Sequence, residues 1–298
     1  METMADLAAM ANDKLVEGFI NEIRTDSYII DTMPFDNCVN ASGTSNLSYS
    51  YDRVETGASA AFRALGSEPA VSELKVKKIT THPGILSNSW KMDRVVKDAL
   101  PSYLELKITE SKNAIIRGFN NALINGDTSA DANGFDGLSK ALKGSSTEFT
   151  SAIDWTNLDK TAALAFATEM DTMLGEMTRD ADVILVNAAM NAKINAAARQ
   201  LGIDTVTMDT AGHRVKAWDG IRIEVLRDGA IKDNSIYAVC LGASDFHGIT
   251  LAGGNGITVS VPDWAQPGAI KTGDAEFVCG CALKATKSAA VLRPATEG

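Results

Sequence analysis

The sequence predicts an α+β fold, and three observations support this prediction. A long amphipathic helix is expected over residues 100–124. Two alternating strands joined by an unusually long loop precede it, and strand patterns dominate after residue 203. The chain has 298 residues, 45% of them hydrophobic and 22% charged, which is enough apolar material for one large domain or two ordinary ones.

Composition excludes several classes of protein. The formal net charge of −10 argues against a chain whose main task is gripping nucleic acid, because that task needs clustered lysine and arginine. No stretch of about 18 apolar residues is present, so no transmembrane helix is expected. The cysteines are too few and too scattered for a disulfide framework, so we expect buried free thiols in a reducing cytoplasm at Cys38, Cys240, Cys279 and Cys281.

The N-terminal region is predicted to be a helix followed by an extended strap over 28–45. Over 3–24, apolar residues recur every fourth position and place one stripe along a helix. Such a stripe needs a partner surface, either the chain's own core or a neighbouring subunit. Its members are Leu7, Ala11, Leu15, Phe19 and Ile23.

Leu47–Val54 and Glu73–Thr80 alternate as strands do, and we call these two strands and the loop between them the finger. Hairpin loops usually have 2–5 residues, whereas this connection has about 18, a length that is often functional. The finger has little apolar material for a core of its own. Its lysines at 75, 77 and 78 are either a solvated strand edge or a docking surface for an acidic patch on another copy.

The long helix leads into a turn-rich segment, Ile124–Leu138, which we call the joint. Asp98 is expected to cap the start of the helix, with Pro101 in its first turn. Asn125–Gly126 is expected to end it, because both residue types tolerate the left-handed conformation.

An α/β region and then a β region are predicted after the joint. Asn157–Thr178 and Ala188–Leu201 are expected helices, the second closed by Gly202, and Asp182–Val186 is an expected buried strand. Later strands are separated by turns at Asp219–Gly220, Asp228–Gly229 and Gly253–Gly256.

The search for chemistry in the sequence finds no catalytic, cofactor-binding or metal-ligating residues. The three histidines, His82, His213 and His247, have no ligand partners at metal spacing and are predicted to be surface or packing residues. Gly253, Gly254 and Gly256 resemble a phosphate loop, but no helix pattern follows them.

A calcium loop can also be tested in the joint. An EF-hand alignment places Ser129, Asp131 and Asn133 at ligand positions, but the twelfth position is Lys140 instead of glutamate. A polar turn is therefore favoured, and a weak cation site of another type stays open.

The order of these elements resembles the major capsid protein of tailed bacteriophages, the Hong Kong 97-type fold. The local matches are LINGD at 123–127 with GFDGL at 134–138, DADVILVNAAMNAKINA at 180–196, and the ending AEFVCGCALKATKSAAVLRP. The resemblance covers nearly the whole chain and implies four parts. These are an N-terminal arm over 1–45, an extended E-loop over 46–90, a peripheral domain with a spine helix over 91–145 and 266–298, and an axial domain over 146–265.

The resemblance implies a structural, non-enzymatic protein of the virion capsid, assembled in the bacterial host cytoplasm. Its expected partner is itself, in hexamers and pentamers of an icosahedral shell. Separate scaffolding, portal and decoration proteins are further expected partners. Packaged double-stranded DNA would lie nearby without sequence-specific binding, and neither a membrane nor a cofactor is expected.

Two departures from the family pattern add expectations. Some relatives cross-link a finger lysine to an asparagine near the C-terminus, but Asn255 is the last asparagine here, so no isopeptide bond is expected. Some relatives begin with a cleaved scaffolding segment. This chain starts near the arm, so scaffolding is expected from another protein or is unneeded.

Two rival functions stay open from the sequence. An encapsulin-like nanocompartment has the same fold with a protein cargo. A soluble α/β enzyme with an unrecognised site is the other rival, and a pocket with clustered perturbed titratable groups would favour it.

Overall fold

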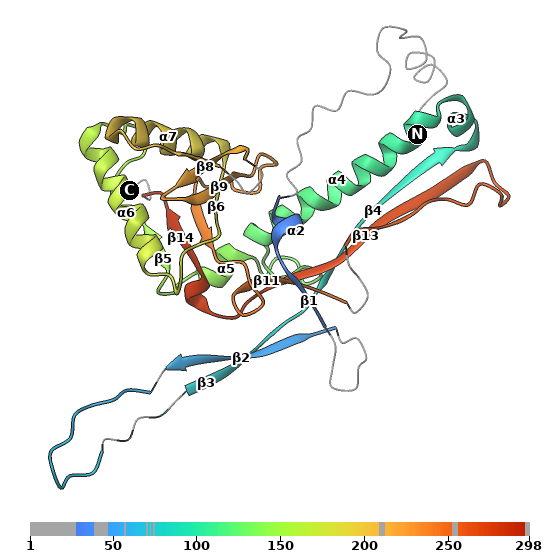
Figure 1. The fold of residues 1–298 in the computed structure, drawn as a ribbon. Coiled ribbons are helices and arrows are strands. Elements are labelled where there is room, and N and C mark those ends of the chain that lie inside the picture. The colour runs from blue at the N-terminus through green and yellow to red at the C-terminus, as the bar shows by residue number, and fades with distance from the viewer. Residues whose placement is uncertain are drawn as a thin grey trace.

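The computed structural model describes residues 28–38, 47–56, 58–69, 71, 73, 75–208, 212–251 and 256–295. The helix predicted over 3–24 and most of the Gly253–Gly256 turn lie outside these ranges. Figure 1 shows three parts: a projecting two-stranded finger, an elongated region with a long helix, and an α/β region. None of the described helices combines the length and the hydrophobicity of a membrane span.

The elongated region combines helix α4 (Pro101–Asn125) with two long antiparallel strands, β4 (Gly84–Asp93) and β13 (Ile270–Leu283). The apolar stripe of α4 packs on one face of this sheet, where the Phe119 and Phe277 rings lie 5.7 Å apart. At the far end, the Trp90 ring lies over its cross-strand partner Gly273, where a Cβ would come within 2.3 Å of the ring. Because α4 packs along these two strands, the sheet fixes the direction of the spine helix.

The start of the spine helix differs from the prediction. Asp93 ends β4 and caps the short helix α3 (Arg94–Ala99), accepting a 2.9 Å hydrogen bond from the Val95 N–H. Asp98 therefore lies inside α3, and no side chain caps α4. The expected cap was wrong because the chain turns between two helices at Leu100.

The α/β region is built on a seven-stranded sheet with the order β5-β14-β10-β6-β9-β8-β7. Helices α6 (Lys160–Gly175) and α7 (Ala188–Leu201) pack on one face, and the joint and α5 (Leu138–Leu142) pack on the other. Both faces are buried, which explains the continuous apolar run of the central strand. The strands are β5 (Glu148–Thr150), β6 (Val183–Val186), β7 (Val206–Met208), β8 (Arg214–Trp218), β9 (Ile221–Val225), β10 (Ile236–Val239) and β14 (Ala289–Arg293).

The helices and the buried strand of this region lie where the sequence predicts them. The strand expected over Asp182–Val186 is β6, and the two expected helices are α6 and α7. Gly202 closes α7 with φ of 71°, the left-handed conformation that favours glycine.

A second sheet joins distant parts of the chain. Strand β13 pairs with β4, with β11 (Phe246–Thr250) and with β12 (Thr258–Ser260), and β11 pairs in parallel with β1 (Phe35–Asn37). The predicted extended strap begins instead with a short helix, α2 (Tyr28–Thr32), and only then becomes β1. A 3-10 turn, η1 (Thr286–Ser288), connects β13 to β14 in the other sheet. The chain thus crosses repeatedly between the two sheets.

Candidate assembly interface

The finger consists of β2 (Tyr49–Thr56) and β3 (Lys75–Thr81), paired antiparallel with a bulge between Val54 and Thr56. Both strands were predicted from their alternation. Every described residue of the connecting loop is exposed, and Figure 1 shows the loop extending away from the rest of the chain. Its large apolar side chains are essentially fully exposed at Phe62, Leu65 and Val71.

Among the described residues, the contacts between the finger and the body of the protein lie at the base of the finger. Alternate residues of β2 point inward: the Tyr51 hydroxyl donates to the Leu283 carbonyl at 2.8 Å, and Arg53 Nε donates to the Lys284 carbonyl at 3.0 Å. Arg53 Nη2 also donates to the Leu283 carbonyl. The rings of Tyr49 and Tyr51 pack beside a small buried cluster of Cys38, Ile249 and Ala282.

Beyond this base, the finger has exposed side chains on both strands and no core of its own. Val54 and Val76 are directly paired across the strands, and both are more than half exposed. Lys75, Lys77 and Lys78 are also exposed. Exposed apolar groups on an extended, unsupported element mark it as a surface for another molecule.

The elongated region also has an uncovered surface. Helix α4 covers one face of the β4–β13 sheet, and most side chains on the other face are exposed. That face and the adjoining tip also expose large apolar side chains, at Ile85, Val95, Val261 and Ile270.

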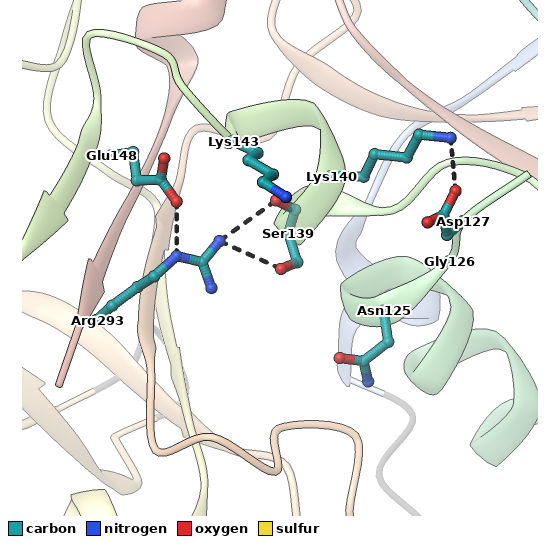
Figure 2. A pocket seen from close by; sticks show the side chains of 8 residues that line it. All are labelled: Asn125, Gly126, Asp127, Ser139, Lys140, Lys143, Glu148 and Arg293. Atoms are coloured by element: carbon teal, nitrogen blue, oxygen red, sulfur yellow. Dashed lines mark hydrogen bonds and ion pairs between the residues drawn. The ribbon is translucent and has the colours of Figure 1, made fainter. Parts of the chain in front are cut away.

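The joint organises its oxygen atoms around an internal cation, the ammonium group of Lys140. Lys140 Nζ lies 2.6 Å from Asp127 Oδ1 and 2.8 Å from Asp136 Oδ1. It also donates to the hydroxyls of Thr128 at 3.1 Å and Ser129 at 3.2 Å. Figure 2 shows the ion pair with Asp127 at the edge of a cavity of about 360 Å³. Lys140, which stands where an EF-hand has its glutamate, therefore supplies the positive charge that these oxygens bind.

Hydrogen bonding to this ammonium group shifts the acidity of the joint. The bond from Lys140 lowers the pKa of Asp127 to about 2. Burial raises the pKa of Asp136, but bonds from Lys140 and the Thr128 N–H outweigh it and leave the pKa below its usual value. The same carboxylates raise the pKa of Lys140. All three groups stay charged at neutral pH.

Two glycines allow the backbone of the joint to pack against the end of α4. A Cβ at Gly126 would lie 2.2 Å from the Phe135 carbonyl oxygen, and one at Gly137 would lie 2.5 Å from the Ala122 carbonyl oxygen. Gly126 has φ of −55°, so the left-handed conformation expected here was wrong. Glycine is needed for close approach of backbone to backbone instead.

The opposite wall of the same cavity is held by Arg293. Its Nε donates to Glu148 Oε1 at 2.7 Å, and its Nη2 donates to the carbonyl and hydroxyl oxygens of Ser139. A hydrogen bond from the Gly144 N–H is the main cause that lowers the pKa of Glu148, and the hydrogen bond and charge of Arg293 lower it further. General acids and bases need a pKa near the working pH, whereas these pairings move each pKa away from neutrality. The cavity therefore brings together groups with shifted pKa values, but each shift favours the charged form, as in a structural ion pair.

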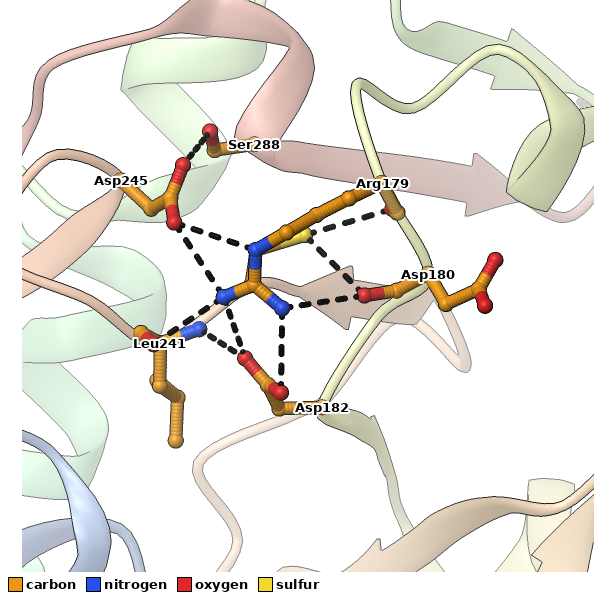
Figure 3. Close-up of polar contacts among 7 residues, drawn as sticks. Arg179, Asp180, Asp182, Leu241, Asp245 and Ser288 are labelled. Atoms are coloured by element: carbon orange, nitrogen blue, oxygen red, sulfur yellow. Dashed lines mark hydrogen bonds and ion pairs between the residues drawn. The ribbon is translucent and has the colours of Figure 1, made fainter.

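A third network, around Arg179, connects the two sheets. Its guanidinium binds both oxygens of Asp182, at 2.7 and 3.1 Å, and Asp245 Oδ2 at 3.2 Å. Asp245 accepts a 2.6 Å bond from the Ser288 hydroxyl. Figure 3 shows Arg179 and Asp182, which lie between α6 and β6, converging with Asp245, just before β11, and Ser288, in η1. The hydrogen bonds to Asp182 raise the pKa of Arg179, so its guanidinium group stays charged.

The histidines and cysteines are not brought together into a metal site. In the part of the chain that the structure describes, no cluster of His, Cys, Asp and Glu could hold a metal ion. All four cysteines are free and buried, as predicted. His82 and His213 are exposed, and His247 lies in the buried strand β11.

Comparison with solved structures identifies the fold. The "capsid of Myoviridae Phage XM1" matches with a TM-score of 0.61 and 12% identity, covering 96% of this chain and 98% of that one. The "capsid of native GTA particle" matches with a TM-score of 0.63 and 12% identity, covering 99% and 100%. The holo-SrpI encapsulin complex of Synechococcus elongatus matches with a TM-score of 0.63 and 12% identity, covering 98% and 95%. No protein-family model and no curated protein sequence matches the chain.

These matches span almost the full length of both partners, and at this identity they define the fold. The chain has the fold shared by phage capsid proteins and encapsulins. In particular it has the Hong Kong 97-type fold predicted from the sequence, with the extended finger, the spine helix and the α/β region described above.

Proposed function

We propose that the chain is the major capsid protein of a tailed phage or prophage, a non-enzymatic subunit that assembles with copies of itself into a closed icosahedral shell. The observation that carries the proposal is the finger, because the apolar loop residues Phe62, Leu65 and Val71 are almost fully exposed in the described structure. Contacts that are weak singly become stable when a closed shell repeats them. We also propose the four-part division predicted from the sequence. Strand pairing links the parts, because β11 pairs with β1 and β13, and β14 pairs with β5 and β10.

The remaining partners follow from this role. Copies of the chain are proposed to form hexamers and pentamers in the virion capsid, assembled in the bacterial cytoplasm. Scaffolding, portal and decoration proteins and packaged double-stranded DNA are proposed neighbours. The acidic balance of the chain is compatible with an inner wall that lies near DNA without gripping it.

Particle formation tests the proposal directly. Electron microscopy and light scattering of the purified protein should show uniform shells. Replacing Phe62 and Leu65 together by serine should leave a folded chain that no longer assembles, whereas Ala60→Ser in the same loop should assemble normally. A wild-type monomer under all conditions, with its finger packed on its own body, would contradict the proposal.

An encapsulin-like shell is the second candidate, favoured by the match to the encapsulin complex. The two functions differ in what the shell encloses. Particles treated with nuclease and protease, then opened and analysed by mass spectrometry, should contain no stoichiometric host protein if the chain is a phage capsid subunit. A single enclosed protein at constant ratio would support the encapsulin-like function.

A further inference from the structure

The base of the finger contains a buried polar chain that shell formation does not explain. His247 on β11 has no exposed surface, and its Nε2 lies 3.2 Å from the Tyr49 hydroxyl. That hydroxyl donates to Asp36 Oδ2 at 2.6 Å. The three residues come from β11, β2 and β1, so this chain connects the finger both to the sheet and to the N-terminal strand.

Hydrogen-bond accounting determines which nitrogen of His247 is protonated. The Tyr49 hydroxyl has one hydrogen and uses it in the bond to Asp36, so Nε2 must supply the hydrogen in the bond between His247 and Tyr49. Nδ1 is then an unprotonated nitrogen, buried without a hydrogen-bond partner. A buried polar atom in this state needs a reason, because most such atoms in folded proteins are paired.

Charged groups of both signs surround the ring. Burial, followed by the charge of Lys284, lowers the pKa of His247, and the charge of Asp36 together with the backbone and carboxylate of Asp245 offset this only in part. The ring is therefore neutral at neutral pH. The titratable and charged groups on the packed elements are Asp36 and Cys38 at β1, Tyr49, Tyr51 and Arg53 on β2, Asp245 before β11, and Lys284 after β13.

We propose that His247 is an acid-sensitive latch, which holds the base of β2 against the sheet when neutral and releases it when protonated. A second proton would place a positive charge in a buried space that Lys284 already faces, and exposure of the ring to water relieves that cost. The latch lies where the finger meets the body, so its release would change the angle of the finger. This inference does not depend on the proposed shell function.

Linkage gives the size of the effect. If the ring regains its ordinary pKa of 6.5 when the base opens, then protonation favours the open form below that pH. Acidification from about pH 7.5 to about pH 5.5 then increases the open population by up to about tenfold. Because His247 lies at the base of the finger, acidification should not open the spine helix α4.

Hydrogen–deuterium exchange of residues 49–56 and 75–81 tests the latch, at the two pH values and corrected for the intrinsic rate. The wild type should lose protection in these strands at the lower pH, while α4 keeps its protection. His247→Gln retains an N–H for Tyr49 but does not titrate, so its exchange should be independent of pH. His82→Gln, which removes an exposed histidine beside the finger, should behave as the wild type does.

Two results would overturn the proposal: equal protection of the wild-type finger at both pH values, or full pH dependence in His247→Gln. If His247→Gln does not fold, an NMR titration of the wild-type His247 ring gives the answer. Its signal should begin to titrate only as the finger strands lose protection. A ring that titrates at its ordinary pKa while the finger stays closed would also contradict the latch.

Discussion

The finger and the joint contain similar residue types but are held in opposite ways. Both are rich in small and polar residues. In the joint, Phe135 and Leu138 are buried, and four oxygen-bearing side chains surround Lys140. In the finger, Phe62 and Leu65 are exposed, and the contacts with the body that the structure describes lie at the base of the two strands.

The difference shows which parts of the fold a single copy determines. The joint buries Phe135 and Leu138 in the main core of the chain and has an internal cation and close backbone contacts, so its conformation is specified within one chain. The register of the finger is set by strand pairing, but in the part of the chain that the structure describes, every residue of its loop is exposed. We infer that neighbouring copies complete it, and the following variants test this contrast from the largest effect to the smallest.

The same substitution in both regions should give opposite results. Phe135→Ala removes a buried ring and should lower the free energy of unfolding by about 4 kcal/mol. Phe62→Ala removes an exposed ring and should change it by less than about 0.5 kcal/mol. Denaturant unfolding of the dissociated protein measures both. A large loss from Phe62→Ala would mean that the finger packs on its own chain.

Gly126→Ala should be the most damaging small change in the joint. The added methyl group would overlap two backbone oxygens, so the turn must shift, at a cost of about 3 kcal/mol. Gly175→Ala is the matched control, because no atom lies within 4 Å of a Cβ there. It should leave the thermal midpoint unchanged or raise it slightly. Equal midpoints for the two variants would contradict the close approach.

Tyr51→Phe should loosen the base of the finger without unfolding the protein. The variant loses the hydrogen bond to the Leu283 carbonyl, and one such bond contributes about 1 kcal/mol. Hydrogen exchange of residues 49–56 should become several times faster, while that of α4 should not change. Tyr28→Phe, at a ring stacked against Arg222 and remote from the finger, should leave both rates as they are.

Acid should weaken the joint through Asp127. Its pKa is about 2 in the folded chain against 3.8 ordinarily, so its stabilising contribution is present above pH 3.8 and is lost as the pH falls towards 2. Lys140→Met removes the hydrogen bonds that cause this shift. Its thermal midpoint should therefore be lower near neutrality and should fall less steeply between pH 4 and pH 2. Parallel profiles for the variant and the wild type would show that Lys140 does not stabilise the joint.

Local patterns in the sequence predict much of the fold. Alternation predicted both finger strands, because a free-standing hairpin depends on little beyond its own side chains. The α7 helix was predicted to the residue, because Asn187 caps it and Gly202 ends it. Strand β4 was missed, although Trp90 and Met92 alternate with exposed Ser89 and Lys91 in a strand pattern.

Long-range pairing is what the sequence did not reveal. Nothing near β1 indicates that it pairs with β11, since the two are more than 200 residues apart. The buried position of His247 and its link to Tyr49 depend on the same pairing. At the joint, the calcium test examined Ser129, Asp131 and Asn133, whereas the oxygens that bind the internal cation belong mainly to Asp127 and Asp136. The sequence shows Lys140 at the twelfth position of the loop, but its contacts with Asp127 and Asp136 are visible only in three dimensions.

Hydrogen exchange of the finger loop, residues 58–73, tests the central claim most directly when it is compared between dissociated subunits and assembled particles. The loop should exchange at the rate of an open chain in the subunit and become protected in the particle. The joint should be protected in both states. Rapid exchange of the loop in intact particles, or protection of the loop in the single subunit, would contradict the claim that neighbouring copies complete the finger.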